Sequence, residues 1–365
     1  MRIVTVVGAR PQFIKAAALS SALAGRHDEL IVHTGQHHDH AMSGRFFEEL
    51  GLPRPAHQLA VHGGSHGHQT GAMLAAIEDV LLAERPDLVL VYGDTNSTLA
   101  GALAAAKLHL PIAHVEAGLR SFNRRMPEEV NRVLTDHLAT LLFAPAPSAV
   151  AQLAREGITA GVHEVGDIML DVARRQLPRG RAAWPAEAGA RPARFAVATI
   201  HRAENTDDAG RLSRLVRALG DLGLPVLLPL HPRTAGALAR CGLTLPPAVR
   251  AVAPLGHAEL LGLARDAHVV LTDSGGLQKE AYFVGTPCIT LRGETEWVET
   301  VATGWNVLVD ADSDRLRDAL RRFEVRPAER PPLYGEGDTA ERIAAILDGW
   351  SAGAAPVAEV RAAAA

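Results

Sequence analysis

The chain has 365 residues, which is too long for one ordinary hydrophobic core and suits two α/β domains. Its formal net charge of -4 at pH 7, without a long stripe of lysine and arginine, argues against broad binding to nucleic acids. The two cysteines, Cys241 and Cys288, lack the spacing of a zinc site or a disulfide framework, and no apolar run suits a signal peptide or a membrane span. We therefore expect a cytoplasmic protein with free thiols and no membrane partner.

Short apolar runs rich in β-branched residues alternate with longer stretches rich in alanine and leucine. This alternation predicts βα units and parallel sheets, and so an α/β fold. The expected strands are residues 2–8, 30–35, 88–94, 112–118, 140–145, 195–201, 225–231, 249–254, 268–274 and 287–292.

Proline, glycine and arginine interrupt the periodicity between Val172 and Arg194, which predicts a linker region. Each half has the pattern of a doubly wound domain, and ligands of such domains bind outside the carboxyl ends of the strands. We therefore expect the ligand in a cleft between the halves. TAERIAAILDGW, near the end of the chain, is amphipathic and predicts a helix, whereas the residues after Pro356 have the composition of a low-complexity tail.

Ionisable residues recur where the expected strands of the first half end. Arg10 lies in the turn after the first strand and Lys15 lies early in the following helix, so both are candidate contacts for an anionic substrate or leaving group. Asp94 and Glu116 follow two other strands. A carboxylate in such a place is either a helix N-cap, which suits Asp94 better than Glu116, or an acid/base group.

MPEEVNRVLTDHL predicts a helix that begins at Pro127 and places Glu128 and Arg132 four residues apart on one face. Taken alone, this pair is typical of a surface ion pair. Polar residues follow strands of the second half as well, namely His201, Arg202, Glu204, Asn205, His231 and Arg233.

The segment TDSGGLQKEA joins an expected strand to an expected helix through a glycine turn. Unpaired amides and the helix dipole favour an anion at such a helix start, and Gly275 and Gly276 let it approach the main chain. Ser274 adds a hydroxyl donor, and Glu280, about one turn further on, suits the diol of a ribose. The combination favours a nucleotide. The alternative is a helix capped by Asp273 or Ser274 without a ligand.

Histidines cluster in HTGQHHDH and HGGSHGHQ, but neither segment has HExxH or Cys/His zinc spacing. We therefore expect no bound metal and interpret these histidines as loop or substrate-contacting residues. The sequence also lacks GxGxxG before a helix, the P-loop pattern and GxSxG, which are the central features of nicotinamide, P-loop and serine-hydrolase sites.

Nine short motifs follow one another along nearly the whole chain: GARPQFIK, TGQHHDHAMS, YGDTNST, HVEAGLRS, PEEVNR, a Gly-Asp pair at 166 and 167, HRAEN, HPRT and TDSGGLQKEA. In their sequence and order the chain resembles non-hydrolysing UDP-N-acetylglucosamine 2-epimerases. The resemblance implies a GT-B fold, in which two Rossmann-like, doubly wound domains face each other across a deep cleft. It implies an N-terminal domain at 1–172, a UDP-binding domain at 173–339 and a helix at about 340–352 that rejoins the first domain.

The same resemblance implies interconversion of UDP-N-acetylglucosamine and UDP-N-acetylmannosamine, for cell-surface polysaccharide precursors, by a homodimer without a cofactor. UDP leaves carbon 1 as carbon 2 loses its proton, and the 2-acetamidoglucal is reprotonated on its other face before UDP adds again. Asp94, Glu116 and Glu128 are the implied acid/base groups, and Arg132 is expected to orient Glu128. The implied contacts to UDP are Arg10, Lys15, His201, Ser274, Gly275, Gly276 and Glu280.

One segment departs from the family pattern, because TEWVET stands where many members carry TERPE and Trp297 therefore replaces an arginine. Tryptophan does not bind phosphate as arginine does, so we expect that this anion contact is given up or moved. With TGQHHDHAMS and GSHGHQTGAML, TEWVE resembles a branch that includes 2-epimerases of UDP-2,3-diacetamido-2,3-dideoxyglucuronate, which makes this sugar an alternative substrate. The family also suggests an effector site near Gln36 and His37. A GT-B glycosyltransferase and a hydrolysing epimerase are the alternative activities.

Overall fold

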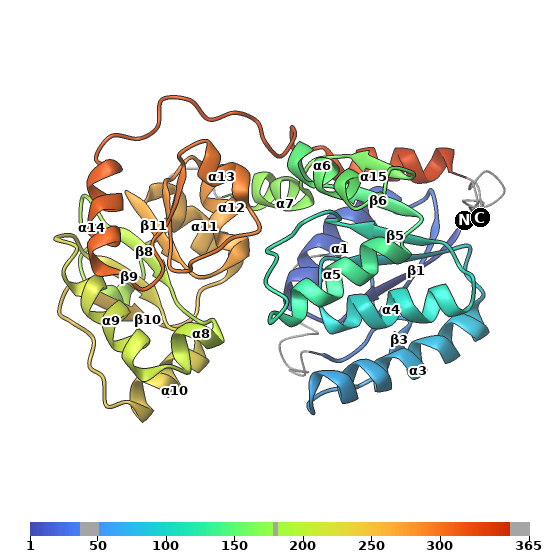
Figure 1. Cartoon of the computed structure of the whole chain (residues 1–365), viewed down its shortest axis with the longest axis horizontal. Helices are drawn as coiled ribbons and strands as arrows, with labels where there is room; N and C mark the ends of the chain where they lie inside the picture. The colour runs from blue at the N-terminus through green and yellow to red at the C-terminus, as the bar shows by residue number, and fades with distance from the viewer. Residues whose placement is uncertain (37–50, 178–181, 351–365) are drawn as a thin grey trace, which may run out of the picture. The chain divides into compact units, whose positions relative to one another are not determined.

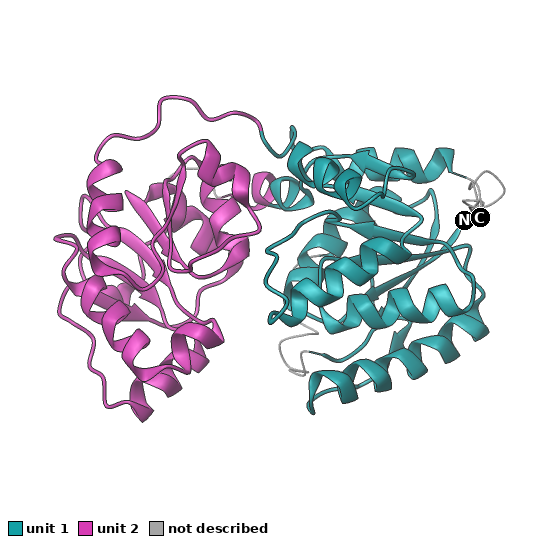
Figure 2. Cartoon of the chain, in the orientation of Figure 1, with its two compact units in different colours: residues 1–172, 333–365 teal, residues 173–332 magenta. Residues whose placement is uncertain are grey.

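The computed structural model describes residues 1–36, 51–177 and 182–350. The chain separates into two compact units, which Figure 2 shows in different colours. Unit 1 comprises Met1–Val172 and the segment that begins at Leu333, and unit 2 comprises Ala173–Pro332.

The described part of unit 1 contains a seven-stranded parallel sheet with the order β3-β2-β1-β4-β5-β6-β7. The strand order reverses between β1 and β4, and the carboxyl ends beside such a reversal are the usual ligand site of a doubly wound sheet. The strands are β1 (Arg2–Val7), β2 (Asp28–His33), β3 (His57–Gln58), β4 (Leu88–Tyr92), β5 (Ile112–Val115), β6 (Leu141–Ala144) and β7 (Val162–Glu164). The helices are α1 (Arg10–Leu23), α3 (His66–Glu84), α4 (Asn96–Lys107), α5 (Pro127–Leu138), α6 (Pro147–Arg155) and α15 (Thr339–Gly349). A further helix, α7 (Ile168–Gln176), begins in unit 1 and ends in unit 2.

Unit 2 repeats the plan, and its described residues form a six-stranded parallel sheet with the order β10-β9-β8-β11-β12-β13. Here the order reverses between β8 and β11. The strands are β8 (Ala196–Thr199), β9 (Val226–Pro229), β10 (Val249–Val252), β11 (Val269–Thr272), β12 (Cys288–Thr290) and β13 (Asn306–Leu308). The helices are η1 (Ala186–Ala188), α8 (Ala203–Thr206), α9 (Ala209–Gly220), α10 (Pro232–Arg240), α11 (His257–Asp266), α12 (Gly275–Val284), α13 (Val298–Ala302) and α14 (Ser313–Arg322).

The central strands are mainly apolar because helices cover both faces of each sheet (Figure 1). In β8, Ala196 and Ala198 pack into the same cluster as Leu212 of α9, whereas Val197 points the other way and packs with Leu263 of α11. The ten predicted strands all form. The sequence interpretation missed β3, β7 and β13, which are edge strands of two or three residues with polar side chains among them.

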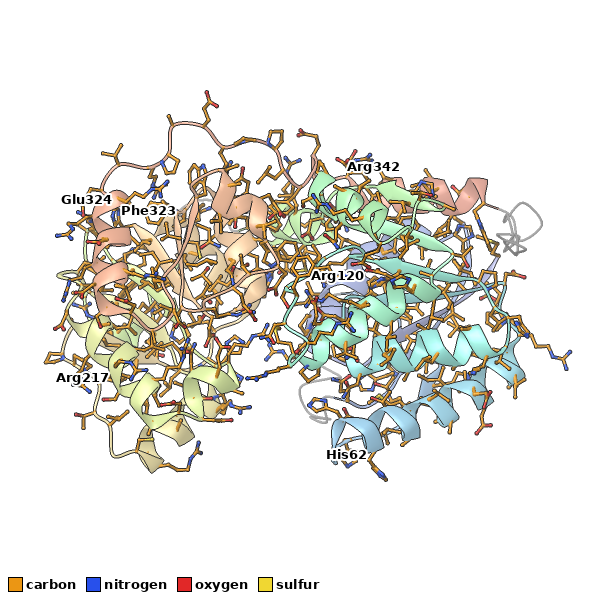
Figure 3. All side chains as sticks on the ribbon, viewed as in Figure 1. His62, Arg120, Arg217, Phe323, Glu324 and Arg342 are labelled. Carbon is orange, nitrogen blue, oxygen red and sulfur yellow. The ribbon has the colours of Figure 1, made fainter. Side chains whose placement is uncertain are left out.

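The last described helix belongs to unit 1. Ile343, Ala344 and Leu347 of α15 are fully buried, and α15 packs against α1. The carboxylate of Asp171 accepts hydrogen bonds from the Thr339 and Ala340 amides at 3.2 and 2.8 Å, so it binds the start of α15. The guanidinium of Arg342, labelled in Figure 3, donates to the carbonyl oxygens of residues 164 and 165, which ties α15 to the end of β7.

The linker region predicted after Val172 begins a few residues later than expected. α7 continues to Gln176, and Ala173 is still buried. Among the described residues, none of the helices has the length and apolar character that a membrane crossing requires.

Candidate active site

The ends of β1, β4 and β5 bring a cation and a carboxylate together in unit 1. Lys15, on α1, and Glu116, directly after β5, form an ion pair whose side chains are only 9% and 11% exposed. Glu116 has a φ of 73°, in the left-handed region that costs a non-glycine residue roughly 1–2 kcal/mol. Strained backbone conformations are common at functional sites. Here the strained residue is one that the sequence analysis names as an acid/base candidate.

The Lys15–Glu116 ion pair lies close to Gly93, where a larger residue would crowd it. A Cβ atom on Gly93 would lie 3.2 Å from Glu116 Oε2 and 3.3 Å from Lys15 Nζ, closer than nine in ten real Cβ contacts. Gly93 also has a φ of 59°. The glycine of the YGD motif is therefore needed both for the turn and for the approach of the two charged groups.

Asp94 follows Gly93 and pairs with the guanidinium of Arg132, whose NH2 atom lies 2.5 Å from Asp94 Oδ2. The neighbouring Asn131 donates to the Asp94 carbonyl oxygen at 2.9 Å. α5 thus holds both the side chain and the main chain of Asp94. The expected alternative, an N-cap role for Asp94, is wrong because Thr95 is the N-cap of α4.

The pKa of Asp94 shows which charges surround it. Burial raises this pKa above its ordinary value, the positive charge of Arg132 opposes the rise, and the negative charge of Glu116 adds to it. Lys15 lowers the same pKa and Glu128 raises it. The structure therefore brings these five predicted residues of unit 1 into one electrostatic neighbourhood.

This neighbourhood contains carboxyl groups in two different settings. The pKa of Asp94 is raised, which favours its protonated form, whereas Glu116 is held against an ammonium group. A carboxyl group whose pKa is raised beside other charged groups is typical of sites that remove and return protons.

Glu129 is a site residue that sequence reasoning missed. It is buried, it accepts hydrogen bonds from the Ser121 and Phe122 amides at 2.9 Å each, and it lies 3.6 Å from Arg132 NH1. Arg132 thus lies between Asp94 and Glu129, and its expected role in orienting Glu128 stays a prediction. The sequence did contain a signal for Glu129. PEEVNR has two adjacent glutamates, and neighbouring residues on a helix point in different directions, so Glu129 faces other groups than Glu128.

Arg10 begins α1 and is exposed. The amides of Gly8 and Ala9, in the turn before it, both donate to Gln12 Oε1, at 2.8 and 3.0 Å. A side chain of the helix thus already satisfies these amides, so an anion at this turn would depend on side-chain cations such as Arg10. Its predicted contact with the diphosphate stays a prediction.

In unit 2, the buried carboxylate of Asp273 connects the ends of β8 and β11. It accepts from the His201 amide at 2.9 and 3.1 Å, from the Arg202 amide at 2.9 Å and from Asn205 Nδ2 at 3.0 Å. The HRAEN segment is thereby held beside the TDSGG segment. Sequence reasoning considered Asp273 only as a possible N-cap, whereas the N-cap is Ser274.

His201 stands at this junction with 34% of its side chain exposed. Burial lowers its pKa below the ordinary value, Asp273 opposes this, and the positive charges of Arg202 and Arg233 and the nearby His231 lower it further. The His201 and His231 rings lie 5.4 Å apart between centroids. An anion bound here would meet a cluster of cationic and hydrogen-bonding groups, as expected for a diphosphate site.

The predicted helix after the TDSGG segment is confirmed as α12, with Ser274 Oγ accepting from the Leu277 amide at 3.4 Å. The predicted glycine turn is wrong in detail, because Gly275 and Gly276 are the first residues of the helix itself. A Cβ on Gly275 would come 2.5 Å from Glu296 Oε1, so close packing requires this glycine. At Gly276 a Cβ would have its nearest described neighbour, Ser274 Oγ, 3.8 Å away.

Glu280 is buried near the middle of α12, where His257 Nε2 lies 2.8 Å from its Oε1 atom. The other ring nitrogen of His257 lies 2.6 Å from Gln176 Oε1. His257 was not among the predicted site residues, because it begins α11 and does not directly follow an expected strand. The expected contact between Glu280 and a ribose stays a prediction.

Trp297, the departure from the family pattern, is buried. Lys279 Nζ lies 4.3 Å from the centroid of its ring, which is a cation–π contact. A cation is therefore present beside the tryptophan, on α12, the helix that Ser274 caps. Of the two expected outcomes, an anion contact that is given up or one that has moved, this arrangement favours the second.

The structure gives little information on the predicted effector site and no candidate for a metal site among the described residues. His37, His38, Asp39 and His40 lie outside the described residues, so the predicted effector site is represented only by Gln36, whose Oε1 atom accepts from Ser97 Oγ at 2.7 Å. Within the described ranges, no group of three or more His, Cys, Asp or Glu residues is placed to hold a metal ion.

A family model described as UDP-N-acetylglucosamine 2-epimerase matches residues 21–348. The chain is 51% identical to the UDP-2,3-diacetamido-2,3-dideoxy-D-glucuronate 2-epimerase of Pseudomonas aeruginosa, over 95% of this chain and 99% of that protein. It is 40% identical to the UDP-N-acetylglucosamine 2-epimerase of Methanocaldococcus jannaschii, over 95% and 99% of the two chains.

Among solved structures, the chain is similar to the Methanocaldococcus jannaschii enzyme in complex with UDP-GlcNAc and UDP. The TM-score is 0.86 at 39% identity, covering 96% of this chain and all (100%) of that one. The solved structures similar to this chain have the GT-B fold. The predicted fold class, with its two doubly wound domains, is therefore confirmed.

Proposed function

Because this chain belongs to the UDP-N-acetylglucosamine 2-epimerase family, we propose that it inverts carbon 2 of a UDP-2-acetamido sugar without hydrolysing it. The chain is thus an enzyme of the isomerase class. The observation that carries the proposed reaction is the group of Lys15, Asp94, Glu116, Glu128 and Arg132 in unit 1, whose charges all act on the pKa of Asp94.

The reaction balances without an external cofactor. A carboxylate takes the proton from carbon 2, the electrons of the C–H bond form the double bond between carbons 1 and 2, and the C1–O bond pair leaves with UDP. A protonated carboxyl group then returns a proton to the other face of the 2-acetamidoglucal, and a UDP oxygen adds again at carbon 1. Two protonation sites are required because the proton leaves one face and returns to the other.

We assign the acid/base chemistry to Asp94, Glu116 and Glu128. The carbon 2 proton is only weakly acidic, so stabilisation of the departing UDP supplies much of the driving force. Unit 2 is suited to this task, because cationic groups flank His201 and α12 begins beside it. We assign UDP binding to Arg10, Lys15, His201, Ser274, Gly275, Gly276 and Glu280.

Two sugars are candidate substrates, and a specific observation favours each. The family description and the Methanocaldococcus jannaschii relative support UDP-N-acetylglucosamine. The 51% identity to the Pseudomonas aeruginosa enzyme, against 40% to the archaeal one, supports UDP-2,3-diacetamido-2,3-dideoxyglucuronate as the second candidate. Trp297 in the TEWVE segment supports the second candidate as well. Comparing kcat/KM for the two sugars decides between them.

Incubation with each UDP-sugar, in the absence of any acceptor, tests the proposed function. Proton NMR should show the manno epimer accumulating to an equilibrium with the gluco form while free UDP stays below stoichiometric amounts. Consumption only after addition of an acceptor would indicate a glycosyltransferase, and stoichiometric UDP with a free sugar would indicate a hydrolysing epimerase.

We further propose that the enzyme works in the cytoplasm as a homodimer and supplies precursors of cell-surface polysaccharides. Cys241 and Cys288 are free thiols, which suits a reducing compartment. Val130 and Leu134, one turn apart on α5, are 38% and 44% exposed, which supports an association surface on this helix. Sedimentation of the purified enzyme tests the dimer.

A further inference from the structure

Beneath the carboxyl groups of unit 1 lies a fully buried histidine. His114, on β5, places its Nε2 atom 2.7 Å from the carbonyl oxygen of Gly93. A carbonyl oxygen only accepts, so Nε2 carries a proton and donates. The Gly93 carbonyl belongs to the peptide that leads into Asp94, and this bond therefore fixes the plane from which Asp94 projects.

The other nitrogen of His114, Nδ1, lies 2.7 Å from Oδ1 of Asp136, a buried carboxylate near the end of α5. The second oxygen of Asp136 accepts from the Gly118 amide at 3.0 Å and from Arg120 NH1 at 2.6 Å. Gly118 is the second residue after Glu116. Asp136 is thus bonded directly to the turn that carries Glu116 and, through His114, to the turn that carries Asp94.

Asp136 retains its charge despite being buried. Burial alone would raise its pKa, but hydrogen bonds and charges from His114 and Arg120 outweigh this effect and hold the pKa below its ordinary value. Arg120, labelled in Figure 3, is in turn held by Glu156, with its Nε and NH2 atoms 2.8 and 2.7 Å from the two carboxylate oxygens. The hydrogen bonds run from Glu156 through Arg120, Asp136 and His114 to Gly93.

α5 completes the connection. Glu128 and Arg132 precede Asp136 by eight and four residues, a spacing that places all three on one side of the helix. The same helix therefore presents Glu128 to the site and anchors the turns of Asp94 and Glu116 through Asp136.

We propose that His114 and Asp136 are positioning residues that set the mutual placement of the three acid/base carboxyl groups. This inference rests on the proposed epimerase function. Both side chains are buried, so neither contacts the sugar. Their contribution is orientation, and a displacement of about 1 Å in a catalytic group can cost on the order of a hundredfold in rate.

Two replacements of His114 separate positioning from plain structural support. In His114→Gln the side-chain amide reaches the place of Nε2 and can still donate to Gly93. In His114→Asn the amide reaches only the place of Nδ1, so the bond to Asp136 is kept and the bond to Gly93 is lost. We expect His114→Asn to lower kcat on the order of a hundredfold with KM unchanged, and His114→Gln to restore most of the turnover. Equal kcat values in two folded variants would overturn the proposal.

A second pair keeps the test decisive if His114→Asn does not fold. The amide oxygen of Asp136→Asn can accept from Gly118 and Arg120, and its NH2 group can donate to His114 Nδ1. The His114 Nε2 proton then stays available for the Gly93 carbonyl oxygen. Asp136→Ala can make none of these side-chain hydrogen bonds. Asp136→Asn should therefore retain turnover that Asp136→Ala loses, and equal turnover in both would also contradict positioning. His57→Gln is the matched control, because it alters the pair of His57, on the partly exposed β3, and Glu84, at the end of α3, whose Nε2 and Oε1 atoms lie 2.8 Å apart.

The wild-type enzyme is assayed beside the variants with UDP-N-acetylglucosamine and with the diacetamido glucuronate sugar. Absence of wild-type epimerisation with both sugars would refute the proposed function. Normal wild-type turnover with indistinguishable variants would refute only the positioning role.

Discussion

The ammonium group of Lys15 and the carboxylate of Glu116, 101 residues apart in the chain, meet directly beside the α-carbon of Gly93. This ion pair joins the end of β1, through α1, to the end of β5, and Asp94 follows the glycine. The geometry explains why a glycine, a strained glutamate and a buried lysine occur together: each is required for the same close approach.

Gly93→Ala should therefore lower turnover. The added methyl group would lie 3.2 and 3.3 Å from Glu116 Oε2 and Lys15 Nζ and would shift these two groups by a few tenths of an ångström. Gly157→Ala is the matched control in the same unit, because Gly157 also has a positive φ, of 80°, but a Cβ there meets no described atom within 4 Å. The control should lose about 1 kcal/mol of stability from its backbone alone and retain activity. Equal activity of the two variants would contradict the crowding at Gly93.

The pKa of Asp94 should respond in opposite directions to two neutral replacements. Arg132→Gln removes a positive charge that lowers this pKa, so the pKa should rise, whereas Glu128→Gln removes a negative charge that raises it, so the pKa should fall. NMR of the carboxyl carbons during a pH titration measures both shifts. Shifts in the same direction would show that these side chains do not surround Asp94 as described.

Glu116→Gln and Glu128→Gln should each abolish exchange of the carbon 2 proton with solvent, because an amide neither takes nor returns it. UDP binding, which we assign to groups mainly of unit 2, should survive in both variants and is measured by calorimetry. Glu164→Gln, at the exposed end of β7, serves as a control of equal chemistry. Wild-type exchange in either of the first two variants would remove that residue from the acid/base set.

The two glycines that open α12 should behave differently. Gly275→Ala should lower stability, because its methyl group would lie 2.5 Å from Glu296 Oε1. Gly276→Ala has room within the protein and adds up to about 1 kcal/mol of helix propensity, so the fold should tolerate it. If a phosphate approaches the main chain at Gly276, that variant should weaken UDP binding about tenfold, or about 1.4 kcal/mol. Unchanged affinity would show that the phosphate binds elsewhere.

Glu280→Ala should raise the Kd for UDP about tenfold if this carboxylate binds the ribose, which corresponds to about 1.4 kcal/mol. The contact with His257 provides the control, since His257→Gln retains a donor toward Glu280 and should leave the Kd unchanged. Calorimetry that found equal affinities for Glu280→Ala and wild type would leave Glu280 with a structural role at His257 only.

The central strands were predictable because burial on both faces requires continuous apolar runs, and each such run in the sequence became a strand. The edge strands β3, β7 and β13 were not, since a strand of two or three residues leaves too short a pattern. The acid/base candidates were predictable for a related reason, because Asp94 and Glu116 interrupt apolar runs at points where a core has no use for charge.

The residues that hold those candidates were harder to find. Asp136 and Glu129 lie on α5 among other polar residues, and only the folded structure shows that both side chains turn inward. His114 did leave a signal, as the one polar residue inside the apolar run IAHV, but its partners lie 21 and 22 residues away and no spacing rule connects them. Asp273 was considered only as one of two possible caps, with Ser274, because its bonds to the HRAEN segment depend on the pairing of β8 with β11.

The central claim is that the carboxyl groups of unit 1 remove and return the proton at carbon 2. The most direct measurement is epimerisation in deuterated water, with carbon 2 of both UDP-sugars followed by proton NMR in wild type and in Glu116→Gln. The account predicts solvent deuterium at carbon 2 of the manno product from wild type, and no exchange in the variant. A manno product that retains its original proton at carbon 2 would contradict the account.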